Sequence, residues 1–212
     1  MSTIAVPALT GFLASHFGLD SRDFRVNEAG EVDARDTDLD LRGVLPGGEL
    51  PGKIDCCRTF RVHGMTGFRN FPRRSEGIWI HDSPRLRNLL GMAQEVERCG
   101  LLALTRLEIE SLDGLPASDG AELVISDCRR LSDISAIPVR HGPRRITFLG
   151  DLHPGFPLLR VAFDARFDMR AIHDRELAEL LKGVKKTDCP TTRQGLELID
   201  QLLSNGYGDM VR

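Results

Sequence analysis

The chain has 212 residues, of which 41% are hydrophobic and 28% charged, and its formal net charge is −3. This composition is ordinary for a folded protein with a real apolar core, so intrinsic disorder is not the expectation. The small net charge provides no overall attraction to nucleic acid or to an anionic membrane surface.

The first 38 residues predict a short helix followed by strand. The helix is indicated by apolar residues at Ile4, Val6, Leu9, Phe12, Leu13 and Phe17, and Gly18 ends it. Residues 24–42 alternate between apolar and polar, which is typical of a strand, with a turn at residues 27–30. No basic region precedes the apolar N-terminal residues, so we expect no secretory signal.

Residues 39–165 repeat a unit of about 21 residues. The clearest copy has an alternating apolar pair, apolar residues at every third position and a closing proline: Leu123, Ile125, Cys128, Leu131, Ile134, Ile137 and Pro138. The same skeleton appears at Ile78, Ile80, Ser83, Leu86, Leu89 and Met92. Residues 102–116 fit with one residue deleted, residues 60–72 form a shorter copy, and fainter copies lie at 39–51 and 146–157. The last apolar residues of successive units are separated by 21, 21, 23, 22 and 19 positions.

Each unit predicts one strand and one return turn. Alternation over three residues places two apolar side chains on the same face of a strand. The following spacing of three suits a 3₁₀ or extended turn, which the proline ends. Because a single unit cannot bury its own apolar face, the units are expected to stack into a parallel sheet on one side of a curved slab.

Residues 123–138, LVISDCRRLSDISAIP, resemble the leucine-rich repeat, whose consensus begins L-x-L-x-x-N/C. Cys128 lies at the Asn/Cys position and Ser83 at the equivalent place, whereas Met65 and Leu107 depart from it. The resemblance implies that this residue bonds neighbouring backbone groups of the turn. The proline-closed ending is similar to the irregular repeats of bacterial and bacteriophage proteins, which implies an α/β solenoid over residues 39–165.

The last segment, residues 166–212, predicts two short helices. Residues 174–181 form the first, which stops near Gly183, and a loop through Cys189 and Pro190 follows. Thr191 or Thr192 is the expected N-cap of the second, which contains Leu196, Ile199, Leu202 and Leu203 and ends at Asn205-Gly206. We expect residues 1–38 and 166–212 to cap the two ends of one continuous domain, since an open solenoid end exposes the core.

A row of strand residues is predicted to face the exposed sheet surface. In a leucine-rich repeat these are the residues between and just after the inward apolar pairs, here Arg61 and His63, Trp79 and His81, Ala103 and Thr105, Val124 and Ser126, and Thr147 and Leu149. Trp and Arg are enriched at interface hot spots. We predict a partner-binding site at Arg61, His63, Trp79, His81, Thr105 and Ser126. In the alternative interpretation, a cap or loop covers Trp79 as ordinary core.

No catalytic, metal or cofactor site is expected. His63 and His81 are predicted on adjacent strands about 4.8 Å apart, but two imidazoles without a carboxylate in the same row make no such site. The acidic run at Asp33, Asp36, Asp38 and Asp40 lacks the glycine and glutamate of a calcium loop, since Leu41 and Gly47 occupy those positions. Neither a Walker loop nor a dinucleotide-binding GxGxxG motif is present.

The charged and cysteine residues leave two points open. The arginines at 69, 73, 74, 85, 87, 129, 130, 140, 144 and 145 either line a basic stripe for an acidic protein or a phosphate backbone, or are scattered solubilising charge. The odd number of cysteines, five, and the absence of a CxxC pair favour a reducing, cytoplasmic compartment. No apolar run approaches the roughly 20 residues of a membrane span.

Two functions follow from these patterns. The favoured one is a non-enzymatic protein-binding module of bacterial or phage origin, cytoplasmic and without a cofactor, with a protein rather than nucleic acid or a membrane as its partner. The alternative is a toxin-like or effector enzyme in which the repeats present substrate and the terminal segments, with His153, His173 and Asp174, carry the chemistry.

Overall fold

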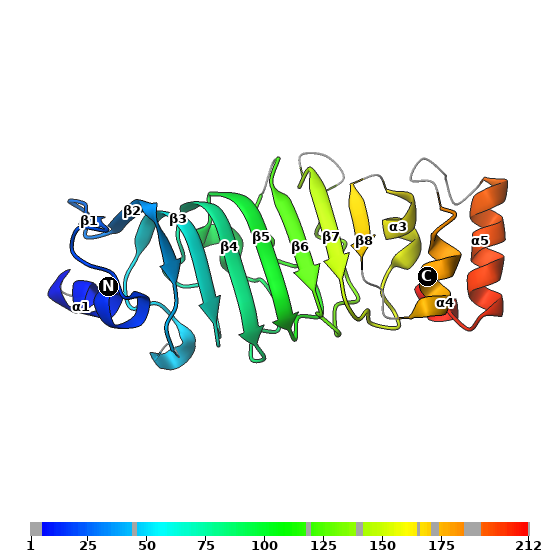
Figure 1. Cartoon of the computed structure of the whole chain (residues 1–212), viewed down its shortest axis with the longest axis horizontal. Coiled ribbons are helices and arrows are strands. Elements are labelled where there is room, and N and C mark those ends of the chain that lie inside the picture. Colours follow the sequence, from blue (N-terminus) through cyan, green and yellow to red (C-terminus); the bar gives the residue numbers. More distant parts are fainter. Residues whose placement is uncertain are drawn as a thin grey trace.

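The structure is a computed structural model that describes residues 6–43, 46–117, 120–138, 142–164, 166–170, 174–184 and 192–211. Its strands form one mixed sheet in which spatial order follows chain order (Figure 1). The strands are β1 (Arg25–Val26), β2 (Val32–Asp40), β3 (Ile54–His63), β4 (Arg74–Ser83), β5 (Arg98–Leu107), β6 (Glu122–Ser126), β7 (Arg145–Leu149) and β8 (Phe167–Arg170). β1 pairs antiparallel with β2, and each later strand pairs parallel with the one before it. The fold is therefore a β-solenoid.

The strand register confirms the predicted ladder. Ile78 pairs with Leu102, which pairs with Leu123, and the next inward residues, Ile80, Leu104 and Ile125, pair in the same way. All of these side chains are at most 3% exposed. The parallel sheet also includes β2 and β8, so it extends on both sides of the stretch in which the repeat is clearest in the sequence.

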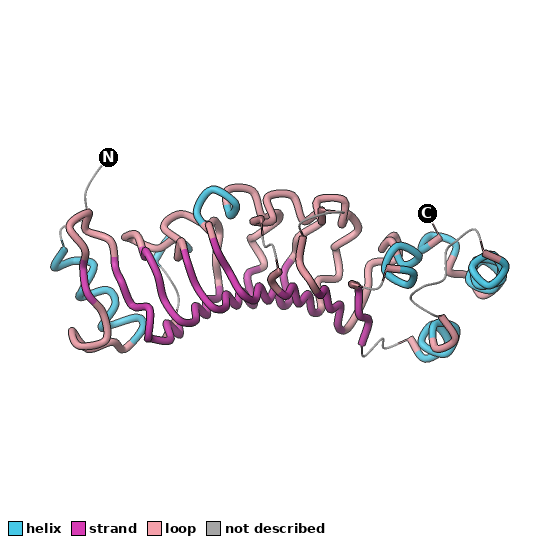
Figure 2. Tube along the Cα trace, turned by 90° about the horizontal axis from the view of Figure 1, so that it is seen from above, coloured by secondary structure: helices cyan, strands magenta, loops and turns pink. Residues whose placement is uncertain are grey.

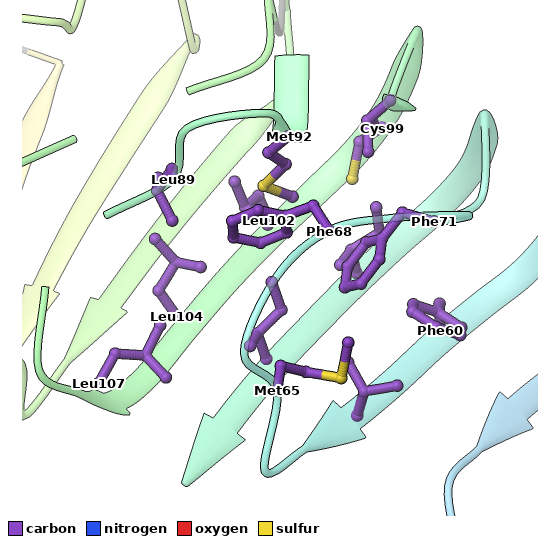
Figure 3. Packing of buried hydrophobic residues seen from close by; sticks show 14 of the residues in the cluster. Phe60, Met65, Phe68, Phe71, Leu89, Met92, Cys99, Leu102, Leu104 and Leu107 are labelled. Carbon is purple, nitrogen blue, oxygen red and sulfur yellow. The ribbon is translucent and has the colours of Figure 1, made fainter. Parts of the chain in front are cut away.

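Turn residues fill the interior against the inward face of the strands, as Figure 3 shows for part of the cluster. Phe60 on β3 makes an edge contact with Phe71 in the following turn, with ring centroids 5.1 Å apart, and Phe68 makes another with Phe71 at 5.3 Å. Burial of each large apolar side chain stabilises the fold by about 1.5–3 kcal/mol. The turns carry the predicted spacing of three: Leu131 N–H donates to the Cys128 carbonyl and Ile137 N–H to the Ile134 carbonyl.

A column of residues with left-handed backbone lies near the strand ends. Its members have φ between 48° and 91°: Gly43 after β2, Gly64 after β3, Asp82 in β4, Arg106 in β5, Asp127 after β6 and Gly150 after β7. Because the column recurs in each unit from β2 to β7, the chain turns away from the sheet with the same backbone conformation each time.

Short helices lie at both ends and within one turn. They are α1 (Val6–Phe17), α2 (Met92–Glu95), α3 (Leu158–Phe163), α4 (Arg175–Leu181) and α5 (Arg193–Ser204), with 3₁₀ segments at Pro46–Gly48 and Gly208–Met210. α1 packs Leu9, Leu13 and Phe17 into the main core, and a second cluster joins Leu158, Leu177, Leu198 and Leu202. In the described part of the chain, no helix combines the length and the apolar character needed to cross a membrane.

The predicted terminal helices are confirmed, and the two C-terminal ones, α4 and α5, have N-caps that accept hydrogen bonds through their side chains. The Thr192 hydroxyl accepts from Gly195 N–H at 3.1 Å, whereas the other candidate cap, Thr191, and the loop cysteine, Cys189, lie outside the described residues. The predicted turn at residues 27–30 joins β1 to β2. α3 and β8 were not predicted.

Candidate partner-binding surface

The outer face of the sheet is partly exposed: Arg61 is exposed and Trp79 and Val124 are half-buried, whereas Ala103 and Thr147 are buried. Figure 2 shows the strands along the concave side of a curved slab, with the turns between β3 and β7 along its convex side. Since successive strand residues point to opposite faces, half of the strand side chains face the concave side. We call this the sheet face and describe it by two rows of register partners.

The two rows contain all six residues predicted to bind a partner. The central row is Arg61, Trp79, Ala103, Val124 and Thr147. The end row lies two residues further along each strand and is His63, His81, Thr105, Ser126 and Leu149. Each residue pairs with the next across neighbouring strands. The placement matches the sequence prediction, whereas binding by these residues stays a prediction.

Trp79 is half-buried, and its contacts explain why. A Cβ atom built on Gly77 would lie 2.4 Å from both Cη2 and Cζ3 of the indole, so the ring covers the glycine two positions earlier on the same strand. The Arg61 guanidinium carbon lies 4.9 Å from the indole centroid, a cation–π contact. Trp79 is absent from the buried core. Gly77 was not among the predicted site residues; its position two residues before Trp79, on the same face of a strand, is the signal that points to it.

Aliphatic side chains continue the apolar surface beyond Trp79. Ala103, the register partner of Trp79 on β5, is buried at 5% exposure; Val124 follows on β6, and Leu101 pairs with Gly77 in the adjacent row. Leu101 and Val124 are half-buried. Polar residues flank this strip on both sides, with Thr59, Glu122 and Arg145 on one and the end row on the other. An apolar centre within a polar rim is the usual anatomy of a protein interface.

The two histidines of the end row lie side by side, and one is held by a carboxylate. The rings of His63 and His81 are 5.4 Å apart between centroids and tilted by 34°. His81 Nδ1 lies 2.9 Å from Asp82 Oδ2. Asp82 also accepts two bonds from Arg106, from Nε at 2.6 Å and Nη2 at 2.7 Å. The Arg106 guanidinium, and secondly His81, hold the pKa of the Asp82 carboxyl well below its usual range.

Sequence reasoning missed the contact between Asp82 and His81. The expectation that no carboxylate shares the row is met, since the neighbours in the row are His63 and Thr105. Regular strand alternation would direct Asp82 to the opposite face from His81. The left-handed backbone at Asp82, with φ of 48°, breaks this alternation and allows the contact.

The residues of the alternative enzymatic hypothesis are engaged in local structure. Asp174 is the N-cap of α4, accepting from Glu176 N–H and Leu177 N–H, and it also accepts from the Tyr207 hydroxyl at 2.8 Å. His153 Nδ1 accepts from Gly155 N–H at 2.9 Å. His173 lies outside the described residues. Where the structure describes side chains, no three His, Cys, Asp or Glu residues gather as metal ligands.

Most of the clustered arginines are neutralised by carboxylates. Arginine pairs with an acid at Arg73–Glu97, Arg74–Asp55, Arg87–Glu108, Arg129–Asp151, Arg130–Glu108, Arg144–Glu122 and Arg145–Asp168. Arg140 lies outside the described residues. The arrangement favours scattered, paired charge over a continuous basic stripe.

No protein-family model, curated protein or solved structure matches the chain.

Proposed function

We propose that this protein is a cytoplasmic, non-enzymatic binding module of bacterial or phage origin, built from leucine-rich-repeat-type units, that recognises a protein partner through its concave sheet face. The observation that carries the proposal is the central row, in which Arg61, Trp79, Ala103 and Val124 stand on four neighbouring strands. Trp and Arg at the centre of a surface are typical of interface hot spots.

The hydrogen bonds of Ser83 and Cys128 support the leucine-rich-repeat assignment. Ser83 is fully buried, and its hydroxyl accepts from Met65 N–H and donates to the His81 carbonyl, each at 3.0 Å. The Cys128 thiol lies 3.5 Å from the Ser126 carbonyl and 3.8 Å from the Leu104 carbonyl. Both side chains thus bond their own strand end and the preceding unit, which is the role expected at the Asn/Cys position.

Contacts of the terminal helices support a capping role. α1 contributes Leu9, Leu13 and Phe17, each at most 4% exposed, to the core near the first strands. At the other end α4 and α5 bury Leu177, Leu198 and Leu202 against Leu158 of α3. We therefore propose that both ends are closed by helices, as solenoids require.

The sheet face suits a protein better than nucleic acid. Binding to a phosphate backbone needs several unneutralised cations. On this face Arg58 pairs with Asp38, Arg145 with Asp168 and Arg106 with Asp82. The apolar strip from Trp79 to Val124 instead offers contact area to protein side chains.

Affinity capture from bacterial lysate with matched variants tests the proposal. The baits are the wild-type chain, Trp79→Ala, Val124→Glu and the control Arg85→Ala, whose side chain is exposed in the turn after β4. A partner that uses the sheet face should be captured at least tenfold less by the first two variants and equally by the control. Circular dichroism must show that every bait is folded. Equal capture by all four baits would contradict the proposal.

A further inference from the structure

We infer that the Arg61–Trp79 pair binds a carboxylate side chain of the partner protein, and that an aliphatic side chain of the same partner rests on Val124, beyond the buried Ala103. The inference rests on the proposed function and specifies the chemistry of the partner.

Arg61 differs from Arg58, Arg106 and Arg145 in that no described carboxylate forms an ion pair with it, although it attracts Asp38 electrostatically. Arg58, Arg106 and Arg145 each contact an aspartate, at Asp38, Asp82 and Asp168 respectively. Across the described ranges, no carboxylate lies within ion-pair distance of Arg61, whose side chain is exposed and contacts the Trp79 ring. A cation presented in this way is available to a carboxylate from outside.

The N–H donors of Arg61 are free of intramolecular hydrogen bonds to the residues that the structure describes, while its guanidinium carbon lies 4.9 Å from the indole centroid. Arginine carries five N–H donors in the plane of its guanidinium. Two parallel N–H donors therefore remain free for a bidentate carboxylate. Because the indole is itself fixed over Gly77, Arg61 is held in place before binding, which reduces the entropy lost on association.

The surroundings of Arg61 favour a singly charged carboxylate over a phosphate. Asp40 is the register partner of Arg61 on β2, and Asp38 lies one outward position earlier on that strand. These acidic groups oppose a dianion more strongly than a monoanion. Only one arginine at the site lacks an ion pair, so charge–charge attraction for a ligand is weak. Bidentate hydrogen bonding to a planar carboxylate is therefore expected to contribute more to binding than net charge does.

The spacing of the row predicts a sequence pattern in the partner. Arg61 and Val124 are separated by three strand spacings, or about 14 Å. An extended peptide covers about 14 Å in roughly four residues. An extended segment that crosses the strands would therefore place an acidic residue about four positions from an aliphatic one, with both side chains on the same side.

Selection from a random peptide library displayed on phage tests the inference with the full chain as the target. Enriched peptides should contain Asp or Glu about four residues from an aliphatic residue. A synthetic copy of one such peptide, measured by fluorescence anisotropy, should bind Trp79→Ala and Arg61→Ala at least tenfold more weakly than wild type. Arg85→Ala should bind it as wild type does.

A double-mutant cycle identifies the pair. Replacing the acidic residue of the peptide by its amide should weaken binding to wild type about tenfold and should have little effect on binding to Arg61→Ala. Equal losses in both proteins would overturn the carboxylate inference, while dependence on Trp79 would leave the proposed function in place. Displacement of the peptide by millimolar inorganic phosphate but not by acetate would also overturn the inference, in favour of a phosphate ligand. A peptide bound equally by wild type, Trp79→Ala and Arg61→Ala would count against the proposed function itself.

Discussion

At the scale of single residues, the left-handed column shows how one backbone position can be occupied by different side chains. Glycine adopts positive φ without steric cost, whereas Asp82, Arg106 and Asp127 adopt it at a steric cost, because each has a Cβ atom. Two of these residues form the bidentate pair between Asp82 and Arg106, and Asp127 accepts from the Ser126 hydroxyl at 2.9 Å. Side-chain bonding thus accompanies the strained backbone at each of the three non-glycine positions.

Alanine substitutions at two glycines of the column distinguish the cost of backbone strain from the cost of a steric clash. A Cβ at Gly64 would meet nothing within 4 Å, whereas one at Gly150 would lie 1.8 Å from Asp127 Oδ1. We expect Gly64→Ala to lower the free energy of unfolding by about 1–2 kcal/mol, the cost of the left-handed conformation. Gly150→Ala should cost more, because the Asp127 side chain must also move. Urea denaturation of both variants measures the difference, and equal losses would show that Asp127 moves away at no cost.

The buried hydroxyl of Ser83 is expected to contribute to stability. In Ser83→Ala, Met65 N–H and the His81 carbonyl each lose a partner inside the fold. Leaving buried polar groups unsatisfied costs about 1–3 kcal/mol. The control is Ser132→Ala, since the Ser132 side chain is exposed. Urea midpoints that coincide for the two variants would rule out this role of Ser83.

These residues also show what the sequence could predict. The positions of Ser83 and Cys128 follow from spacing alone, because the inward period of the repeat is strict around them. The contacts of Gly77 and Asp82 were missed, because they depend on the direction of one indole ring and on one positive φ. Spacing predicts which face a residue occupies, but it does not predict local exceptions to the alternation.

At the scale of elements, the candidate surface lies mainly on the longer strands. β3, β4 and β5 have 10 residues each, whereas β6 and β7 have 5. The outward row before Trp79 contains Thr59, Gly77 and Leu101, and it continues through Glu122 on β6 and Arg145 on β7. Glycine at position 77 of this row leaves the space in which the indole of Trp79 lies.

The packing of Trp79 on β4 can be followed by tryptophan fluorescence, because Trp79 is the only tryptophan of the chain. In Gly77→Ala, the new Cβ would overlap Cη2 and Cζ3 of the indole, so the ring must turn outward into solvent. We expect a red shift of the tryptophan emission maximum with little change in the urea midpoint. Gly11→Ala is the control, since a Cβ there meets nothing within 4 Å. An unchanged spectrum for Gly77→Ala would mean that the indole does not rest on this glycine.

The bond between the ends of β4 and β5 makes stability depend on pH. Because Arg106 lowers the pKa of Asp82, folding favours the ionised carboxylate. The stabilisation is therefore present above the unfolded-state pKa of about 3.9 and is lost as the pH falls below it. Since the pair is about half exposed, we expect a contribution of at most about 1 kcal/mol.

Urea midpoints at pH 5 and pH 2.5 test this contribution. The difference between the two should be smaller in Asp82→Asn than in wild type, while Asp36→Asn, which changes another exposed carboxylate, should behave as wild type. Asp33, Asp38 and Asp168 also have lowered pKa values, chiefly because of Arg35, Arg58 and Arg145, so part of the acid sensitivity should remain. An unaltered pH response in Asp82→Asn would contradict the linkage.

Helices and strands could be predicted where the local sequence carries strong capping and periodicity signals. α5 combines an N-cap threonine, a regular apolar period and an Asn-Gly stop, and its bounds were predicted closely. α3 is the short, almost wholly apolar segment LLRVAF, in which helix and strand periods cannot be distinguished. β8 has four residues and joins the sheet through its pairing with β7.

At the scale of the whole molecule, one buried cluster runs from Leu9 on α1 to Phe167 on β8. Each strand pairs only with its chain neighbours, so the contacts between strands join adjacent units. Stability in such an array is approximately a sum over units and over the interfaces between adjacent units. A complete unit should therefore be removable, provided that the alternation of the strand is preserved.

The register identifies where such a unit begins and ends. Leu102 pairs with Leu123, so deletion of residues 102–122 joins Leu101 to Leu123 and leaves Leu123 in the inward position that Leu102 occupied. Val124 then takes the place of Ala103 beside Trp79, and Cys128 takes the place of Leu107. We expect a folded, shorter solenoid with a lower urea midpoint, because one set of unit interfaces is lost.

A deletion that is one residue shorter provides the matched control. Removing residues 102–121 would place Glu122 in the inward position and direct Leu123 to the sheet face, because a slip of one residue exchanges the two faces of a strand. A buried, unpaired glutamate is strongly destabilising, so we expect this variant to lose its β-type circular dichroism spectrum or to aggregate during size-exclusion chromatography. If both deletions fold equally well, the alternation does not define the unit, and the assignment of Trp79 to an outward row loses its main support.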